Sequence, residues 1–349
     1  MSQTDPLPVH RIPARQLQQA TTDLLIAAGT PETIAQVVSK ILVGANLTGH
    51  DSHGVLRVPT YLKQIQSGDI QPAAKPEIRR ETENTLFIDG QNGFGHFTAH
   101  KAMALAIDKA KEGALCNVSF LRTGHIGRLG DYAEQAAHAG CIGLIYYGIG
   151  TSGRGGTVPY GGMDGRLSTN PMAAGVPTGD DTPFVLDMAT SMVAEGKLQV
   201  ARSKEQDLPE GYIVNKEGQP TVKTADFYDG GYLLPFGGHK GYGLSLLTCL
   251  LGALSGETNG DEGLVRGTYM QVINVEAFTP LADYQRTART LLDWMKATQP
   301  APTMDEVLVP GDPEQHTRTQ RLAEGIDVPL IIYEQLHECA KQLQISIDL

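Results

Sequence analysis

The sequence CIGLIYYGIGTSGRGGTVP, residues 141–159, decides between two kinds of α/β fold. Residues 141–147 are an apolar run typical of a buried strand, and Gly148–Gly153 matches the G-x-G-x-x-G pattern of dinucleotide-binding turns. That pattern binds a pyrophosphate only where a helix follows at once, because the phosphates lie at the helix N-terminus. The glycines and the proline of residues 153–159 break a helix. We therefore expect no Rossmann site here, but a glycine-rich loop near a binding site.

Outside this stretch, apolar periodicity predicts an α/β protein with a mixed sheet, a helical N-terminal part and helices appended after the sheet. Residues 203–234 are polar and have few periodic positions. The predicted helices are 14–28, one that begins near Pro31, 53–65, 99–112, 129–139, 192–203, 241–254, 281–296 and 329–343. The predicted strands are 77–80 and 85–88 as a hairpin, 114–121, 141–147, 172–177, 184–186, 268–275 and 306–309.

Composition limits the class of protein. A chain of 349 residues suits about two domains. The net charge of -11 disfavours nucleic acid and anionic membranes as partners. No apolar run reaches the roughly 18 residues of a membrane span, and residues 1–16 lack the apolar core of a signal peptide. Since the four cysteines are widely spaced and form no C-x-x-C pair, we expect a reducing cytoplasm.

A compact group of polar and titratable residues, GHDSHGVLR at 49–57, follows an apolar helical segment. His53 and Arg57 are four residues apart, so that in a helix they share one face. Together they offer a proton donor and a cation suited to a carboxylate or phosphate. Asp187, at the end of a later strand, could orient such an imidazole or could cap a helix. The alternative for residues 49–57 is a solvated helix end with a structural histidine.

A second histidine and arginine lie in a glycine-rich turn, TGHIGRLG at 123–130, between a strand and a helix. Turns that leave a strand are frequent binding positions in α/β sheets. The glycines let backbone amides approach a ligand closely. His125 and Arg128 are therefore candidate binding residues, and the alternative is a tight turn with a capping histidine.

Two segments suit a ligand's phosphates or hydroxyls. Lys240 lies among four glycines before an apolar helix, an arrangement that can hold an anion. Asp312 and Glu314 follow Pro310-Gly311 and could accept ribose hydroxyls, or could be first-turn acids that complement a helix dipole.

We expect no metal site. His96 and His100 have the spacing of one helical face, but the glutamate of a zinc-protease motif is missing because Phe97 follows His96. His50 and His53 are also close in sequence. Neither pair is accompanied by a cluster of cysteines or carboxylates at ligand spacing.

Taken together and in order, these segments resemble the type-2 malate/L-lactate dehydrogenase family of NAD(P)-dependent oxidoreductases, which lacks a Rossmann domain. The resemblance spans residues 10–345, and GHIGRLG at 124–130 with LPFGGHK at 234–240 is most similar to the hydroxycarboxylate dehydrogenase branch. Ile126 and Arg128 depart from the Ser-Asn-His-Phe-Gly-like string of many relatives. The matching segments are DSHG at 51–54 with Arg57, GHIG at 124–127, TNP at 169–171, VLDMAT at 185–190, GHKGYG at 238–243 and PGD at 310–312.

The resemblance implies a largely antiparallel central sheet and a homodimer whose active site lies between domains. Residues 1–75 would pack with the C-terminal helices of 280–349 as one domain, and residues 76–279 would form a mixed-sheet NAD(P)-binding domain. The implied reaction is hydride transfer between NAD(P)H and C2 of a small 2-oxo or 2-hydroxy acid, malate-like or lactate-like. The cofactor would supply the hydride, and the protein would supply geometry and proton transfer.

The resemblance also implies roles for single residues. His53 would move a proton to and from the substrate oxygen, with Ser52 and Asp187 as its relay, and His125 is the rival for that role. Arg57 and His125 would hold the substrate carboxylate or the cofactor phosphates. The residues that would line the cofactor are Gly127, Arg128, Thr169, Asn170, Pro171, Val185, Leu186, Asp187, Lys240, Gly241, Gly311, Asp312 and Glu314.

Two other functions stay open at this point. An imine reductase of the same fold would transfer the hydride to a cyclic imino acid, piperideine-2-carboxylate or pyrroline-2-carboxylate. A non-catalytic metabolite-binding protein would not need Ser52-His53 together with a full cofactor set. The coenzyme, NAD or NADP, is open as well, and the candidate partners of a 2′-phosphate are Arg57, Arg122, Arg128 and Arg154.

Overall fold

The computed structural model describes residues 8–151, 156–203, 205–259 and 263–349. Ser152 and Gly153 of the G-x-G-x-x-G pattern, and Arg154, lie outside the described residues. In the described part, no helix is long and apolar enough to cross a membrane.

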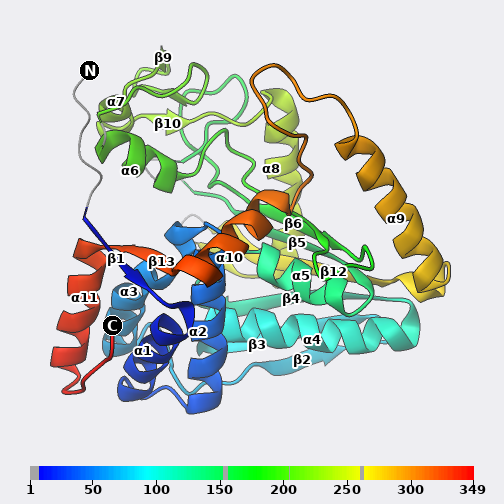
Figure 1. The fold of residues 1–349 in the computed structure, drawn as a ribbon, viewed down its shortest axis with the longest axis horizontal. Coiled ribbons are helices and arrows are strands. Elements are labelled where there is room, and N and C mark those ends of the chain that lie inside the picture. Colours follow the sequence, from blue (N-terminus) through cyan, green and yellow to red (C-terminus); the bar gives the residue numbers. More distant parts are fainter. Residues whose placement is uncertain (1–7, 152–155, 204, 260–262) are drawn as a thin grey trace.

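The centre of the molecule is a sheet with the strand order β2-β3-β4-β12-β5-β6-β7, and β11 pairs with β12 (Figure 1). Among these described strands, β3 and β4 pair in parallel and every other neighbouring pair is antiparallel. The predicted mixed, largely antiparallel α/β class is therefore confirmed. The strands are β2 Glu77–Glu81, β3 Thr85–Gly93, β4 Leu115–Thr123, β5 Cys141–Ile149, β6 Met172–Val176, β7 Phe184–Met188, β11 Thr258–Asn259 and β12 Leu264–Asn274.

Helices cover both faces of this sheet. Buried alternate residues of β5, such as Cys141 and Ile145, face α4 (Gly95–Gly113) and α5 (Gly130–His138), and they share one apolar core with them. The opposite face carries α8 (His239–Gly252) and the short turn η3 (Ala253–Ser255), and a β-carbon built on Gly148 would lie 2.5 Å from the α-carbon of Cys249 on α8. The sheet is thus held between two layers of helices.

The two ends of the chain share a second core. It joins the N-terminal helices to the last helix, through residues such as Leu17, Leu42 and Leu336. In Figure 1 these blue and red elements lie side by side, whereas α9 (Leu281–Lys296) lies at the other end of the molecule. The division into domains stays a prediction. The elements that contribute to this core are β1 Val9–Ile12, α1 Ala14–Ala27, α2 Glu32–Leu47, α3 Val58–Ser67, β13 Ile326–Pro329 and α11 Leu330–Gln342, and α10 Asp312–Glu324 packs against α2.

Residues 193–203 and 205–234 form a small unit with its own apolar core, which includes Val193, Leu198 and Phe227. Its helix α6 (Glu195–Ser203) passes close to the candidate site, since a β-carbon built on Gly196 would lie 3.1 Å from Cβ of Ser52. The other elements of the unit are β8 Ile213–Val214, β9 Pro220–Thr221, α7 Thr224–Tyr228 and β10 Tyr232–Leu233.

Two local predictions were wrong. Residues 51–57 form two 3-10 turns, η1 (Asp51–His53) and η2 (Val55–Arg57), instead of the start of one helix, so His53 and Arg57 do not share a helical face. At the break between the turns, the side-chain oxygen of Asn46 accepts a hydrogen bond from the backbone N–H of Val55 at 2.9 Å. A side chain at Gly54 would collide with Asn46, because its β-carbon would lie 2.2 Å from that oxygen.

The second wrong prediction is the strand at 306–309, where the structure has no strand. The backbone N–H of Val309 donates to the carboxylate of Asp312 at 3.0 Å, which makes the segment a turn into α10. A last short turn, η4 (Val275–Ala277), follows β12.

Candidate active site

Two imidazoles from distant parts of the chain meet at the end of β4. His53 ends η1, and His125 lies in the turn after β4. Their rings stack with centroids 5.5 Å apart and an interplanar angle of 27°. The η1 turn is fixed from α10, because Arg321 donates to both carboxylate oxygens of Asp51, at 2.7 and 3.0 Å. The segment that carries His53 is therefore held between the N-terminal helices and α10.

Each of these imidazoles is bound by a hydroxyl at Nδ1. The hydroxyl of Ser52 lies 2.9 Å from Nδ1 of His53, and the hydroxyl of Tyr61 on α3 lies 2.8 Å from Nδ1 of His125. No described residue hydrogen-bonds Nε2 of either ring, and neither Nε2 is among the fully enclosed polar atoms. Both rings therefore present Nε2 to a ligand.

Burial keeps these imidazoles neutral. It lowers the pKa of His53 to about 4, and the positive charge of Arg57 acts in the same direction. The pKa of His125 is lowered well below its ordinary value by burial and by His96. His96 is fully enclosed, and burial lowers its pKa to about 3. Neutral imidazoles suit the acceptance of a proton from a hydroxyl group.

A guanidinium without a carboxylate partner lies beside them. Nε of Arg57 donates to the carbonyl oxygen of Ser52 at 2.8 Å, which fixes the stem of the side chain. Among the described residues, no carboxylate lies within ion-pair distance of Arg57. Its remaining N–H groups can bind a carboxylate or a phosphate.

Asp187 lies at the end of β7, but the structure gives it other partners than His53. Its carboxylate accepts from the backbone N–H of Gly130 at 2.7 Å and lies 3.7 Å from Nε of Arg128. Arg128 is buried and also pairs with Asp131 at 3.0 Å. Burial raises the pKa of Asp187, against the effect of Arg128. The relay between Asp187 and His53 stays a prediction.

The turn 169–171 is built into the scaffold. Asn170 is fully buried, accepts from the backbone N–H of Ile149 at 2.8 Å and donates to the hydroxyl of Ser245 at 2.9 Å. The carbonyl oxygen of Thr169 accepts from Thr190, and that of Pro171 accepts from Tyr147. The polar side chain of Asn170 is therefore occupied in joining β5 to α8.

A second group of predicted residues surrounds the start of α10. Val185, next to Leu186 on β7, donates its N–H to the carbonyl oxygen of Pro310 at 3.2 Å. Gly311 has a left-handed φ of 104°, and a β-carbon there would lie 3.2 Å from Pro183 and Val185 backbone atoms. A narrow cavity at this place is lined by Thr48, Arg128, Val185, Gly311, Glu314 and Arg318, among others.

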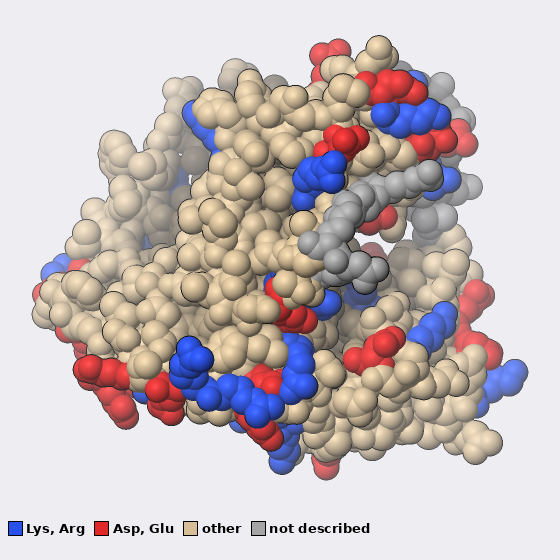
Figure 2. All heavy atoms as spheres, turned by 180° about the vertical axis from the view of Figure 1, so that it is seen from behind, with Lys and Arg blue, Asp and Glu red and all other residues tan. Residues whose placement is uncertain are grey.

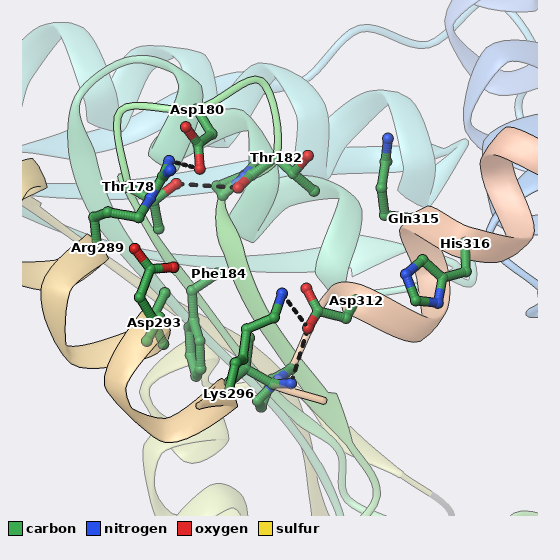
Figure 3. Close-up of a pocket in the computed structure, with 14 residues that line it drawn as sticks. Thr178, Asp180, Thr182, Phe184, Arg289, Asp293, Lys296, Asp312, Gln315 and His316 are labelled. Atoms are coloured by element: carbon green, nitrogen blue, oxygen red, sulfur yellow. Dashed lines mark hydrogen bonds and ion pairs between the residues drawn. The ribbon is translucent and has the colours of Figure 1, made fainter. Parts of the chain in front are cut away.

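The two acidic residues of this group already have hydrogen-bond or ion-pair partners. Asp312 accepts from the N–H of Val309 and lies 2.9 Å from Nζ of Lys296. Glu314 lies 3.3 Å from Nε2 of His50. Figure 3 shows the adjoining cavity of about 170 Å³, where Lys296 reaches from α9 to Asp312 and Arg289 reaches to Asp180.

Lys240 and Gly241 lie in the first turn of α8, and no described contact joins them to the imidazole pair. Lys240 is exposed, and Gly241 packs against the backbone of Phe236. Gly127 packs against His96, since a β-carbon there would lie 2.7 Å from its Nε2.

The sequence did not lead us to Tyr61, to His96 as a neighbour of His125, or to Arg266. Arg266 lies on β12 and donates to the carbonyl oxygen of Thr123, two residues before His125. No local signal marks Tyr61, because a tyrosine at helical spacing is typical of a core residue.

Comparisons with known proteins agree with this architecture. The family model described as malate/L-lactate dehydrogenase matches residues 12–337. Malate dehydrogenase from Pyrococcus horikoshii is 36% identical over 96% of each chain, and its solved structure superposes with a TM-score of 0.87 over 100% of each chain at 32% identity. Hydroxycarboxylate dehydrogenase B from Escherichia coli K12 is 33% identical over 96% of this chain and 94% of its own.

A further solved structure, Δ1-piperideine-2-carboxylate reductase from Pseudomonas syringae pvar. tomato, is 28% identical. It covers 95% of this chain and 100% of its own, with a TM-score of 0.82.

Proposed function

The chain belongs to the malate/L-lactate dehydrogenase family of oxidoreductases, and we propose that it transfers a hydride between a nicotinamide cofactor and C2 of a small 2-oxo or 2-hydroxy acid. The observation that carries this proposal is the pair of stacked imidazoles beside Arg57. Each presents a free Nε2, and Arg57 has no carboxylate partner among the described residues. A 2-oxo acid requires a partner for its carboxylate and one for its oxygen.

In the direction of reduction, the carboxylate of the acid binds Arg57. As the hydride adds to C2, the electron pair of the C=O bond moves to oxygen. Nε2 of protonated His53 donates a proton to that oxygen, which returns the imidazole to the neutral form that burial favours, and the product is the 2-hydroxy acid. In the reverse direction neutral His53 accepts the hydroxyl proton, and Ser52 stabilises the resulting imidazolium through Nδ1.

The described residues fit a nicotinamide dinucleotide, which when bound supplies or accepts the hydride. Nε of Arg128 is buried without a hydrogen-bond partner in the cavity beside Val185 and Gly311. The bare backbone at Gly311 leaves room that a side chain would fill. Arg128 and Arg318 would face its phosphates, and Glu314 would accept a hydroxyl of a ribose.

We propose NAD as the preferred coenzyme. Of the four arginines that could bind a 2′-phosphate, Arg122 pairs with buried Asp89. Arg57 would bind the substrate in this proposal, and Arg128 the pyrophosphate. Arg154 lies outside the described residues. None of the described candidates is therefore left to bind a 2′-phosphate.

A homodimer in a reducing cytoplasm is also part of this proposal. Four exposed leucines lie on the elements that cover the sheet face opposite to α4 and α5. They are Leu246, Leu247 and Leu250 on α8, and Leu254 on η3. Figure 2 shows a broad area of uncharged residues on the side of the molecule opposite to the view of Figure 1. All four cysteines are free thiols. Sedimentation velocity tests the dimer, and a monomer at micromolar concentration would contradict it.

The second candidate function is reduction of a cyclic imino acid, which the similarity to Δ1-piperideine-2-carboxylate reductase favours. One assay separates the two functions. The absorbance of NADH, and separately of NADPH, is followed with pyruvate, oxaloacetate, hydroxypyruvate and cyclic imino acids. Oxidation with the 2-oxo acids supports the proposal, oxidation only with imino acids selects the alternative, and oxidation with neither contradicts both.

A further inference from the structure

Tyr61 is a buried residue whose phenol hydroxyl reaches the candidate active site. Its side chain comes from α3 and is 2% exposed. The ring meets Phe94 and His96 edge-on, with centroids 6.2 and 5.4 Å away. Its hydroxyl lies 2.8 Å from Nδ1 of His125, and no other partner of that hydroxyl is described. The packing therefore fixes the phenol at one atom of one imidazole.

The direction of this hydrogen bond follows from burial. A buried hydroxyl whose proton has no acceptor destabilises the folded protein. Nδ1 of His125 is the acceptor within reach, so the phenol donates and Nδ1 accepts. Burial also raises the pKa of Tyr61, which keeps its proton in place. A neutral imidazole that accepts at Nδ1 carries its own proton at Nε2.

His125 is also held neutral. The titratable and charged groups that face it come from several elements: His53 on η1, Arg57 on η2, His96 on α4 and Arg266 on β12, and each disfavours a positive charge on its ring. If Nδ1 of His125 carried a proton, its N–H would face the O–H of Tyr61, and two donors would meet. The enclosed phenol has no second acceptor for its proton among the described residues.

His53 has a different anchor. The hydroxyl of Ser52 is only half-buried, and it can turn to donate to Nδ1 or accept from it. His53 can therefore hold a proton on either nitrogen, as a residue that gains and loses a proton during turnover must. The two hydroxyls give the two stacked imidazoles unequal freedom.

We propose that Tyr61 is a positioning residue that locks His125 as a neutral Nε2–H hydrogen-bond donor, and so leaves proton transfer to His53. The assignment of roles in turnover rests on the proposed function, but the lock itself does not. His125 then donates to the substrate oxygen or carboxylate without changing its charge. Tyr61 never touches the substrate in this arrangement.

Nitrogen NMR of the full-length protein tests the lock without turnover. The protein is labelled with ¹⁵N-histidine, and the His125 signals are assigned by their loss in His125→Gln. We expect a protonated Nε2 and an unprotonated, hydrogen-bonded Nδ1 from pH 5.5 to 8 in the wild type. In Tyr61→Phe we expect a mixture of the two neutral tautomers. A wild-type His125 that carries its proton at Nδ1 overturns the proposal, even if Tyr61→Phe does not fold.

Tyr132→Phe is the matched control, because Tyr132 is an equally buried phenol whose hydroxyl donates to a backbone carbonyl, that of Ile126. It loses a similar hydrogen bond without freeing Nδ1 of His125, and its His125 signals should stay as in the wild type. In the coenzyme assay, we expect Tyr61→Phe to lower kcat about 10-fold and to add an ionisation to the pH profile of kcat. A tautomer and pH profile in Tyr61→Phe that match those of Tyr132→Phe overturn the proposal. A wild type that has the expected tautomer and oxidises no coenzyme contradicts the proposed function alone.

Discussion

The imidazole of His53 stacks on that of His125 at a centroid distance of 5.5 Å, although the two rings are anchored to hydroxyls of different elements. Ser52 precedes His53 in its own turn, whereas Tyr61 belongs to a helix packed against His125. Two adjacent neutral imidazoles can thus serve one substrate oxygen in different ways. The stacking also means that a positive charge on one ring disfavours a charge on the other.

His53→Asn should lower kcat by at least about 100-fold, the usual contribution of a general acid or base. The amide keeps hydrogen-bonding capacity but cannot take up a proton. Coenzyme affinity, measured by the fluorescence of bound NADH, should stay within about 3-fold of the wild type. His10→Asn is the control, since His10 stacks on Tyr333 and lies outside the candidate site. Turnover near the wild-type rate in His53→Asn would give the proton transfer to another residue.

Arg57→Met should raise KM for a 2-oxo acid by roughly 10- to 100-fold, because a charge-assisted hydrogen bond is worth about 1.5–3 kcal/mol. The methionine keeps the length of the stem but removes the charge. Steady-state kinetics with a 2-oxo acid and with its amide measure the effect. If KM for the amide rises as much as KM for the acid, Arg57 does not bind the carboxylate.

The stability of the protein should fall as the pH falls from about 6.5 to about 4. His53 and His96 have pKa values of about 4 and about 3 in the folded state, against 6.5 for a histidine in the unfolded chain. In that window the unfolded chain binds protons that the folded chain does not bind. Each buried imidazole therefore lowers the free energy of unfolding by up to about 1.4 kcal/mol for each pH unit of acidification. Above pH 6.5 both imidazoles are neutral in the folded and in the unfolded chain, so their titration no longer changes the free energy of unfolding.

Urea unfolding at pH 7.5, 6.5, 5.5 and 4.5 measures this loss, and His96→Phe should make the slope shallower. Phenylalanine fills the enclosed space between Tyr61 and Gly127 without a titrating group. Equal slopes in the two proteins would show that His96 is protonated, or solvated, in the folded state.

The local sequence predicts much of the sheet and of its helices, because an apolar run after Gly140 marks β5 and apolar periodicity marks α5 and α9. It does not predict β1 and β13, since Arg11 bonds Asp327 at a separation of 316 residues, and no local pattern encodes such a pairing. The two-residue strands β8 and β9 are too short for alternation to be visible. Residues 306–309 are apolar enough to suggest a strand, but the carboxylate of Asp312 accepts a hydrogen bond from the backbone N–H of Val309.

The candidate site divides in the same way. His53 and His125 are predictable, because each stands in a polar, glycine-flanked turn after an apolar segment. Tyr61 is not, since a tyrosine at helical spacing in an apolar helix is typical of a core residue. Asn170 is predicted from its place in a polar turn, and the structure buries its side chain in the scaffold between Ile149 and Ser245, so its contact with the cofactor stays a prediction.

Gly54→Ala should destabilise the protein by more than about 2 kcal/mol and lower activity as well. The new β-carbon would lie 2.2 Å from the side chain of Asn46, which holds the N–H of Val55 and the carboxylate of Asp51. Relief of that collision shifts the turn that carries His53. Gly44→Ala is the control on the same helix as Asn46, where a β-carbon meets nothing within 4 Å, and it should stabilise by about 0.5–1 kcal/mol. Urea unfolding and kcat decide the outcome. If the two variants are equally stable and active, the contact between Gly54 and Asn46 does not set the position of His53.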